Sequence, residues 1–253
     1  PVYPEFDRER HVAAQALRPC PELPLWAGLD FGLTPAAVLG QKMPDGRWVG
    51  WSPRPPMETG DIQATAMAIR ALTLYPMPGR SQELQARVRK ARQFLESAVP
   101  VTTEEYVMRL LGLAWSGAPA GTVRQAADSL VAMQKVGGGW SQLPGLAPDA
   151  YATGKALYAL GEVARMLPEV KMDAQVRKRG VAFLTGTRHA DGSWHVVTRS
   201  YPVQPLIDTG YRHGRDQWIS AAASSWAAIA LLDADATQDG AMATATPAVR
   251  VER

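Results

Sequence analysis

Cysteine is almost absent from the sequence, with Cys20 the only one among 253 residues. A single thiol excludes a disulfide within the chain and a zinc site built from several thiolates. Long apolar runs are missing as well, because no window approaches the ~18 consecutive apolar residues of a membrane-spanning helix. We therefore expect a soluble chain without a transmembrane segment, and these absences leave its compartment open.

Clusters of one charge sign are missing too. The 27 basic and 24 acidic residues give a formal net charge of +3, and both signs are interspersed along the chain. Nucleic-acid binding requires a basic patch, so we expect no nucleic-acid partner for the bulk of the chain. The hydrophobic share of 46% is enough for a sizeable core. Because the first residue is Pro1, we expect any native start and targeting signal to lie outside the sequence.

What the sequence does contain is a repeated helical pattern. Its template is [Asp/Ser]-x-x-Ala-[Thr/Ser]-x-x-Ala-x-x-Ala-Leu, which places small residues on one helical face. Full copies begin at Asp61, Asp149 and Ser220, and a weaker copy begins at Thr103. Recurrence of one helical unit is typical of a repeat protein, and the long last interval indicates an insertion.

The periodicity predicts seven helices in two layers. The first, third, fifth and seventh are rich in small residues and nearly uncharged, whereas the others carry Arg and Lys on one face. This alternation predicts an inner layer wrapped by an outer one, in a mostly α fold. From residue 236 onward the chain is unpatterned, and we expect a disordered tail over 236–253. The predicted helices are at about 61–75, 82–98, 103–116, 121–135, 149–166, 173–187 and 216–233. At the start of the third, Thr102 or Thr103 and the glutamates that follow predict a capping box.

Three turns share the pattern [Asp/Gly]-Gly-x-Trp, at residues 45–48, 137–140 and 191–194. Two of them have a glutamine upstream, Gln41 and Gln134. Glycine gives the tight backbone, and the indole can stack on the neighbouring repeat with its N–H satisfied nearby. We interpret these tryptophans as structural.

These turns and the paired helices of residues 41–235 resemble the QW repeats of squalene-hopene cyclases. They also resemble the α/α toroid of protein prenyltransferase β subunits, and the stretch Lys178–Leu184 followed by 191–194 is the fullest match. The resemblance implies a partial α/α toroid of inner and outer helices that binds an apolar, isoprenoid-like ligand. The chain is also similar to cyclase-like domains of bacterial proteins without an assigned function, which implies a bacterial cytoplasm or periplasm.

The sequence departs from both enzyme families at the residues that carry their chemistry. Class II cyclases protonate their substrate from an Asp-x-Asp-Asp motif, of which Asp233-Ala234-Asp235 is only an incomplete echo. Prenyltransferases hold zinc with Asp, Cys and His, yet Cys20 lies outside the repeats. Enzyme activity is therefore left uncertain, and we expect no cofactor.

Residues 1–40 have a different character. Residues 26–32 predict a short strand that ends in Asp-x-Gly, and residues 36–40 predict its hairpin partner. This segment resembles the start of the nuclease half of a phage terminase large subunit, an RNase H-like fold in which the equivalent of Asp30 is a metal ligand. The later acidic residues of that family have no counterpart, so the resemblance implies an incomplete nuclease. The alternative is that Asp30 caps a turn.

A polar loop before the last helix is the one constellation that suggests chemistry. It fills the insertion in the repeat, where function often resides. His195, Asp208 and His213 are candidates for a divalent metal or an acid/base pair, and Tyr211 for ligand contact. The alternative is a structural loop in which Asp216 caps the last helix and the histidines bond to backbone.

The inner helices supply a second set of candidates. Asp61 and Asp149 begin equivalent helices, which predicts helix caps. The functional interpretation is that the inner-helix ends face a central cavity, and it makes Asp61 a candidate for ligand contact. Asp149 is also, with Asp208, a candidate catalytic acid. Aromatic side chains at a cavity between inner helices would suit an isoprenoid or stabilise a carbocation, and they would suit an ordinary core equally well. These aromatic candidates are Tyr151, Tyr158, Trp218 and Trp226.

The sequence thus favours a helical toroid module that binds an apolar small molecule or a partner protein. The alternatives are an isoprenoid-processing isomerase or transferase, and a fragment of a terminase nuclease. The oligomeric state does not follow from the sequence.

Overall fold

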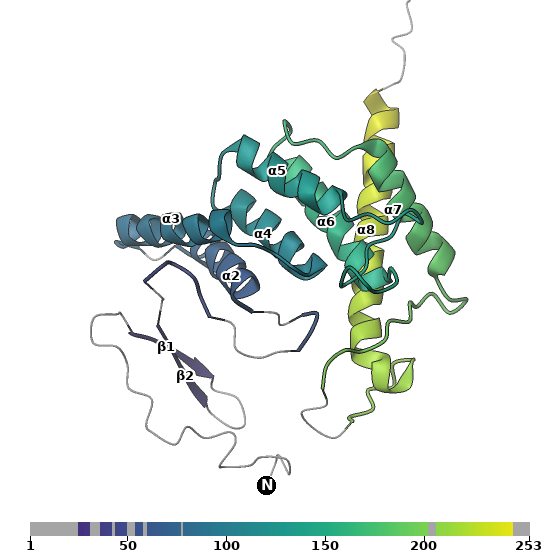
Figure 1. Ribbon diagram of the computed structural model, residues 1–253, viewed down its shortest axis with the longest axis horizontal. Helices are drawn as coiled ribbons and strands as arrows, with labels where there is room; N and C mark the ends of the chain where they lie inside the picture. Colours follow the sequence, from purple (N-terminus) through teal and green to yellow (C-terminus); the bar gives the residue numbers. More distant parts are fainter. Residues whose placement is uncertain are drawn as a thin grey trace, which may run out of the picture.

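The computed structural model describes residues 25–30, 36–41, 44–49, 54–57, 60–76, 78–201 and 206–244, without the side chains of residues 25–41 and 235–244. Within these residues the chain is mostly α-helical, with the seven helices that the sequence predicts (Figure 1). The helices are α2 (Gly60–Leu74), α3 (Ser81–Ser97), α4 (Thr103–Trp115), α5 (Ala120–Val131), α6 (Ala150–Met166), α7 (Ala174–Thr187) and α8 (Gln217–Thr244), and the 3-10 helix η1 (Gly214–Asp216) precedes α8.

A β-hairpin precedes the helices. Strand β1 (Leu25–Asp30) pairs antiparallel with β2 (Ala36–Gln41), so that Asp30 lies opposite Ala36. This is the strand pair that the sequence suggested. The side chain of Asp30, Cys20 and most of the terminase-like segment lie outside what the structure describes, and the metal hypothesis there stays a prediction.

The helices form an inner row and an outer row. In the inner row α2 packs on α4, α4 on α6, and α6 on α8. The outer helices α3, α5 and α7 pack on these inner helices, and Figure 1 shows α4 and α6 between α2 and α8. The predicted alternation of inner and outer helices is therefore present.

Small residues allow the inner helices to approach closely. A Cβ atom added to Gly154 of α6 would lie 2.6 Å from the carbonyl carbon of Trp226 in α8. A Cβ added to Gly112 of α4 would lie 2.8 Å from the Cβ of Ala66 in α2. The small face of the repeat template is thus the face on which inner helices meet, and the core runs along it.

Two of the inner helices have N-terminal side-chain caps, as the sequence suggested. Thr102 and Glu105 form a reciprocal capping box at the start of α4, and the Asp149 carboxylate accepts a hydrogen bond from the backbone N–H of Ala152 in α6. Asp61 differs from the expectation, because α2 begins at Gly60 and the Asp61 carboxylate instead pairs with Arg47 at 3.1 Å.

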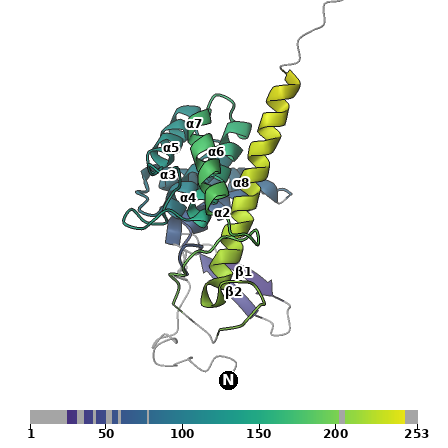
Figure 2. The same cartoon turned by 90° about the vertical axis from the view of Figure 1, so that its right-hand side faces the viewer.

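The C-terminal helix is longer than predicted. Helix α8 continues to Thr244, so the expectation of a disordered tail from residue 236 is wrong for the residues up to 244. The stretch after Asp233 is rich in alanine, the best helix former, and its few turn-forming residues do not stop the helix. Figure 2 shows α8 reaching past the other helices. No helix in the described part of the chain is long and apolar enough to cross a membrane.

Candidate functional site

The three tryptophan turns have the same main-chain geometry. Gly46, Gly138 and Gly192 have φ angles of 92°, 88° and 87°, in the left-handed region that favours glycine. The N–H of the tryptophan two residues later donates to a hydroxyl of the next inner helix: Trp48 to Thr65 (2.8 Å), Trp140 to Thr153 (2.9 Å) and Trp194 to Ser224 (3.0 Å). These hydroxyls are the [Thr/Ser] position of the repeat template, which explains why that position is polar inside a small-residue helix.

The indole groups connect the turns to the outer helices. Trp140 Nε1 donates to the carbonyl of Leu130 and Trp194 Nε1 to that of Leu184, both at 2.8 Å and both ten residues upstream. Among the described residues, the buried Nε1 of Trp48 has no hydrogen-bond partner. The second and third tryptophans therefore tie each turn to the outer helix that precedes it, as a structural role requires.

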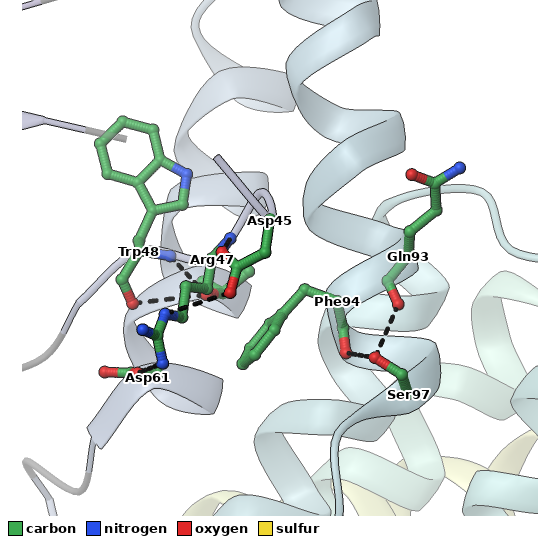
Figure 3. A network of polar contacts seen from close by, with 8 residues as sticks. Asp45, Arg47, Trp48, Asp61, Gln93, Phe94 and Ser97 are labelled. Atoms are coloured by element: carbon green, nitrogen blue, oxygen red, sulfur yellow. Dashed lines mark hydrogen bonds and ion pairs between the residues drawn. The ribbon is translucent and has the colours of Figure 1, made fainter. Parts of the chain in front are cut away.

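The first two turns also support the outer helix that follows. A Cβ on Gly46 would lie 2.5 Å from the carbonyl oxygen of Lys90 in α3, and one on Gly138 would lie 2.4 Å from that of Arg179 in α7. Figure 3 shows the first turn, where Arg47 lies between Asp45 and Asp61 and the ring of Phe94 points from α3 toward the turn. These turns are packing elements.

The polar groups that packing does not explain lie between α4 and α6. The buried carboxylate of Glu104 pairs with the buried ammonium of Lys155, and the hydroxyl of Tyr151 donates to the same carboxylate at 3.1 Å. Gln63 of α2 donates to Glu104 from 3.4 Å. Three inner helices thus converge on one carboxyl group near the N-terminal ends of α4 and α6.

Burial dominates the electrostatics of this cluster. It raises the pKa of the Glu104 carboxyl, and the charge of the Lys155 ammonium and the hydrogen bonds from Lys155 and Tyr151 oppose that rise. Burial also raises the pKa of the Tyr151 hydroxyl, and the neighbouring Glu104 carboxylate raises it further. A desolvated carboxyl beside a cation is the kind of group that active sites use for proton transfer, although structural ion pairs share these features.

Aromatic rings continue the cluster toward α8. The Lys155 ammonium lies 5.5 Å from the ring centroid of Tyr151 and 5.3 Å from that of Trp226, within cation–π range. Tyr158, one turn after Lys155, packs against Trp226 with ring centroids 5.1 Å apart. Burial is the main cause that raises the pKa of the Tyr158 hydroxyl. The charge of Asp233 on α8 raises this pKa as well, whereas the charge of Arg70 on α2 lowers it. We call Glu104, Tyr151, Lys155, Tyr158 and Trp226 the inner cluster.

The structure therefore brings together three of the four aromatic candidates, Tyr151, Tyr158 and Trp226. Trp218 has a different place, because 53% of its side chain is exposed on α8. Asp149 caps α6 and is also partly desolvated. Burial raises the pKa of its carboxyl, whereas hydrogen bonds from Ala152 and Gln142 lower it. Asp208 is exposed and accepts a hydrogen bond from the N–H of Gly210.

The histidines of the polar loop form a cluster of their own. The rings of His195 and His213 stack with centroids 4.8 Å apart, and His189 lies 5.3 Å from His213. His213 Nε2 lies 3.0 Å from the Ser193 hydroxyl, and that hydroxyl donates its hydrogen to the Asp191 carboxylate at 2.7 Å. No group of three or more His, Cys, Asp or Glu side chains in the described ranges is arranged to hold a metal ion.

The expectation that Asp216 caps the last helix is wrong. Asp216 lies in η1, where its carboxylate pairs with His195 at 2.8 Å and accepts a hydrogen bond from the N–H of Thr198 at 2.9 Å. Tyr211 donates its hydroxyl to Ser224 at 2.7 Å. The loop is thus fastened to α8 by side chains, and the histidines bond to side chains where backbone was expected.

The His213 imidazole predicts a loss of stability on acidification. Partial burial and the charges of His195, His189 and Arg212 lower the pKa of His213, whereas Asp191 opposes the shift. Below the ordinary histidine pKa, the imidazole is therefore protonated more readily in the unfolded chain than in the folded one. The free energy of unfolding is highest above that pKa and decreases as the pH falls. Urea unfolding at pH 7.5 and pH 5.5 should show a smaller loss in His213→Asn, since asparagine tolerates the φ of 77°. Equal losses in both proteins would refute this role.

Sequence reasoning missed Glu104 and Lys155. Glu104 stands beside Glu105, and the pair suggested only a capping box, which Glu105 alone completes. A lysine in the middle of an inner helix whose other charged residues, Glu162 and Arg165, lie toward its C-terminal end was the available signal, because a buried ammonium requires a partner.

Comparison of the sequence with protein-family models and with curated proteins found no match.

Proposed function

We propose that the chain is a toroid-type helical binding module that holds an apolar, isoprenoid-like small molecule against the inner cluster. The arrangement of Tyr158 and Trp226 carries the proposal. Both rings are half-buried and meet at the junction of α6 and α8, where they offer aromatic surface without being sealed in the core. Apolar pockets with a few fixed polar groups are the usual form of small-molecule sites.

The charges of the cluster favour a ligand without net charge. Lys155 is neutralised by Glu104, and Arg165 is neutralised by Glu162 and Asp233. Arg70 lies over the ring of Trp115 at 5.0 Å and is engaged there. Because these cations are already engaged, an anionic head group would have to displace an existing partner, whereas a hydrocarbon chain would not.

An isoprenoid-processing enzyme is the second candidate, and the state of Glu104 favours it. Its carboxyl is desolvated and lies beside aromatic rings, which are the features of a buried proton donor near a developing carbocation. Glu104 is better placed for this role than Asp208, which is exposed, and Asp149 shares the raised pKa but caps a helix. In this mechanism Glu104, in its protonated form, gives its proton to one alkene carbon, and the π electrons form the new C–H bond and leave a carbocation on the other carbon. The Glu104 carboxylate, stabilised by Lys155, then takes a proton from a neighbouring carbon, which completes an isomerisation.

Ligand binding is expected to depend on Trp226. Farnesol, added to the purified chain and followed by native mass spectrometry, should bind the wild-type protein and bind Trp226→Ala about tenfold more weakly. The weaker binding follows from the loss of ring surface beside Tyr158. The matched control is Trp218→Ala, which removes the same residue type from an exposed position of the same helix and should leave binding unchanged.

Circular dichroism establishes that each variant is folded, and Trp226→Phe provides a milder change of the same ring. Equal effects of the Trp226 and Trp218 substitutions, or no retained farnesol, would contradict the binding site. Gas chromatography of the released ligand separates the two candidates, since an unchanged molecule supports a binding module and an isomer supports an enzyme.

A further inference from the structure

Within the part of the chain that the structure describes, the inner row is open at both ends, and the two ends are related by the repeat. Helix α6 has α4 on one side and α8 on the other, whereas α2 and α8 are the first and last inner helices of the described chain. Residues of α2, α6 and α8 correspond through the template that starts at Asp61, Asp149 and Ser220. The contacts of α6 with α8 therefore indicate what the free faces of α8 and α2 are shaped to meet.

Two positions define the contact between α6 and α8. Gly154 of α6 lies against the backbone of Trp226 and Ala227, and Gly161 of α6 lies against the carboxylate of Asp233. Gly154 lies five residues and Gly161 twelve residues after the start of the template at Asp149. These two positions mark the face of an inner helix against which the next inner helix packs.

The same positions on α8 and α2 are exposed and apolar or uncharged. Ser225 and Leu232 of α8 correspond to Gly154 and Gly161, and Met67 and Leu74 of α2 correspond to Trp226 and Asp233. Leu232 is 68% exposed, Met67 is 53% exposed and Leu74 is 50% exposed. Suppose that α2 of another copy packs on α8 in the way that α8 packs on α6. Leu232 would then contact Leu74, and Ser225 would contact Met67.

We propose that the protein associates head to tail, with α8 of one copy packed against α2 of a second copy so that the inner row continues across the junction. A second copy is the occupant that the repeat register favours, because it places Leu74 of one copy against Leu232 of the other. The interface is heterologous: the surface on α8 is distinct from the surface on α2. This inference concerns assembly and stands independently of the proposed ligand.

The turns carry an independent sign that the row is open. Gly46 and Gly138 press against the following outer helix, whereas a Cβ on Gly192 would meet no described atom within 4 Å. At the other end the buried Trp48 Nε1 has no partner among the described residues that matches the carbonyls bound by its counterparts in the later turns. Contacts that are complete within the row are thus incomplete at its two ends.

Sedimentation of the full chain over a range of micromolar concentrations tests the proposal with two charge variants. The wild-type mass should rise above that of the monomer, whereas Leu232→Lys and Leu74→Glu should each lower self-association. An equimolar mixture of the two variants should associate again, because the unchanged Leu74 surface of one variant meets the unchanged Leu232 surface of the other. Val136→Lys is the matched control, since Val136 is fully exposed in a turn away from both faces.

Each alternative result overturns the proposal. A monomer at all concentrations excludes the interface, and a mixture of variants that stays monomeric excludes the pairing of the two leucines. Association that responds to Leu232→Lys but not to Leu74→Glu indicates a symmetric contact of α8 with α8. Both substituted leucines are at least half exposed, so the variants should fold, and circular dichroism provides the check.

Discussion

Replacing Lys155 by methionine is expected to lower the free energy of unfolding at pH 7 by about 3–5 kcal/mol. Methionine keeps an apolar stem of similar length, but it leaves the Glu104 carboxylate buried without a cation. The hydroxyl of Tyr151 and the amide of Gln63 remain as hydrogen-bond donors. Neutral donors do not compensate for the loss of a charge partner in a desolvated site, so the penalty should be large.

The penalty is expected to shrink on acidification. Burial already raises the pKa of Glu104, and removal of Lys155 raises it further, because the ammonium opposes that rise. A raised folded-state pKa means that stability is fully present below the unfolded-state pKa and is lost as the pH rises through the folded-state value. The difference between Lys155→Met and the wild type should therefore decrease from pH 7 toward pH 4.

Urea denaturation of four proteins measures this effect. The double variant Glu104→Gln/Lys155→Met should be more stable at pH 7 than Lys155→Met alone, since it carries no unpaired charge. Lys178→Met, on the exposed face of α7, is the matched control and should stay within about 0.5 kcal/mol of the wild type. A loss below about 1 kcal/mol for Lys155→Met, or a difference that does not change with pH, would mean that the pair is not desolvated.

Gly138→Ala is expected to be far more destabilising than the same change at Gly192. Both residues occupy the same turn position with φ angles of 88° and 87°, so both variants pay the left-handed backbone cost of about 1–2 kcal/mol. Only at Gly138 does the added methyl group meet the backbone of Arg179, which adds an overpacking cost of about 1–3 kcal/mol. The comparison isolates the docking of α7 on the turn.

Thermal and urea unfolding of the two variants, followed by circular dichroism, gives the comparison directly. Losses of equal size would show that the turn tolerates a shift of α7 and that backbone strain alone matters. A larger loss for Gly192→Ala would contradict the packing described for the second turn. In a self-associating protein the measurements belong at one fixed concentration, because assembly adds to apparent stability.

Much of the fold follows from the sequence because local rules and the repeat agree. Predicted and observed helix starts differ by one residue or less in all seven helices, and the capping box at Thr102 was readable from its spacing. Helix ends were less accurate, as α8 shows, because a helix of alanines ends where its surroundings stop it and not at a fixed residue type.

The candidate site was less predictable, because it depends on which side chains meet between helices. Tyr151, Tyr158 and Trp226 stand at helical positions that can face a neighbour, so periodicity found them. Glu104 and Lys155 are 51 residues apart in the sequence and lie on different helices. A single sequence contains no signal that links these two positions. Trp218 satisfied the same aromatic criterion and proved exposed, since composition does not tell which face a residue takes.

The fastening of the polar loop has a consequence for how the protein can diversify. Its first end is held where the N–H of Val196 donates to Ser220 at 3.1 Å, and Asp216 binds the N–H of Thr198 across the base of the loop. With both ends held at the start of α8, the intervening residues that do not bond to α8 can be exchanged without moving the helices that the loop joins. The loop is thus a position at which a new binding sequence can be inserted while the helices keep their arrangement.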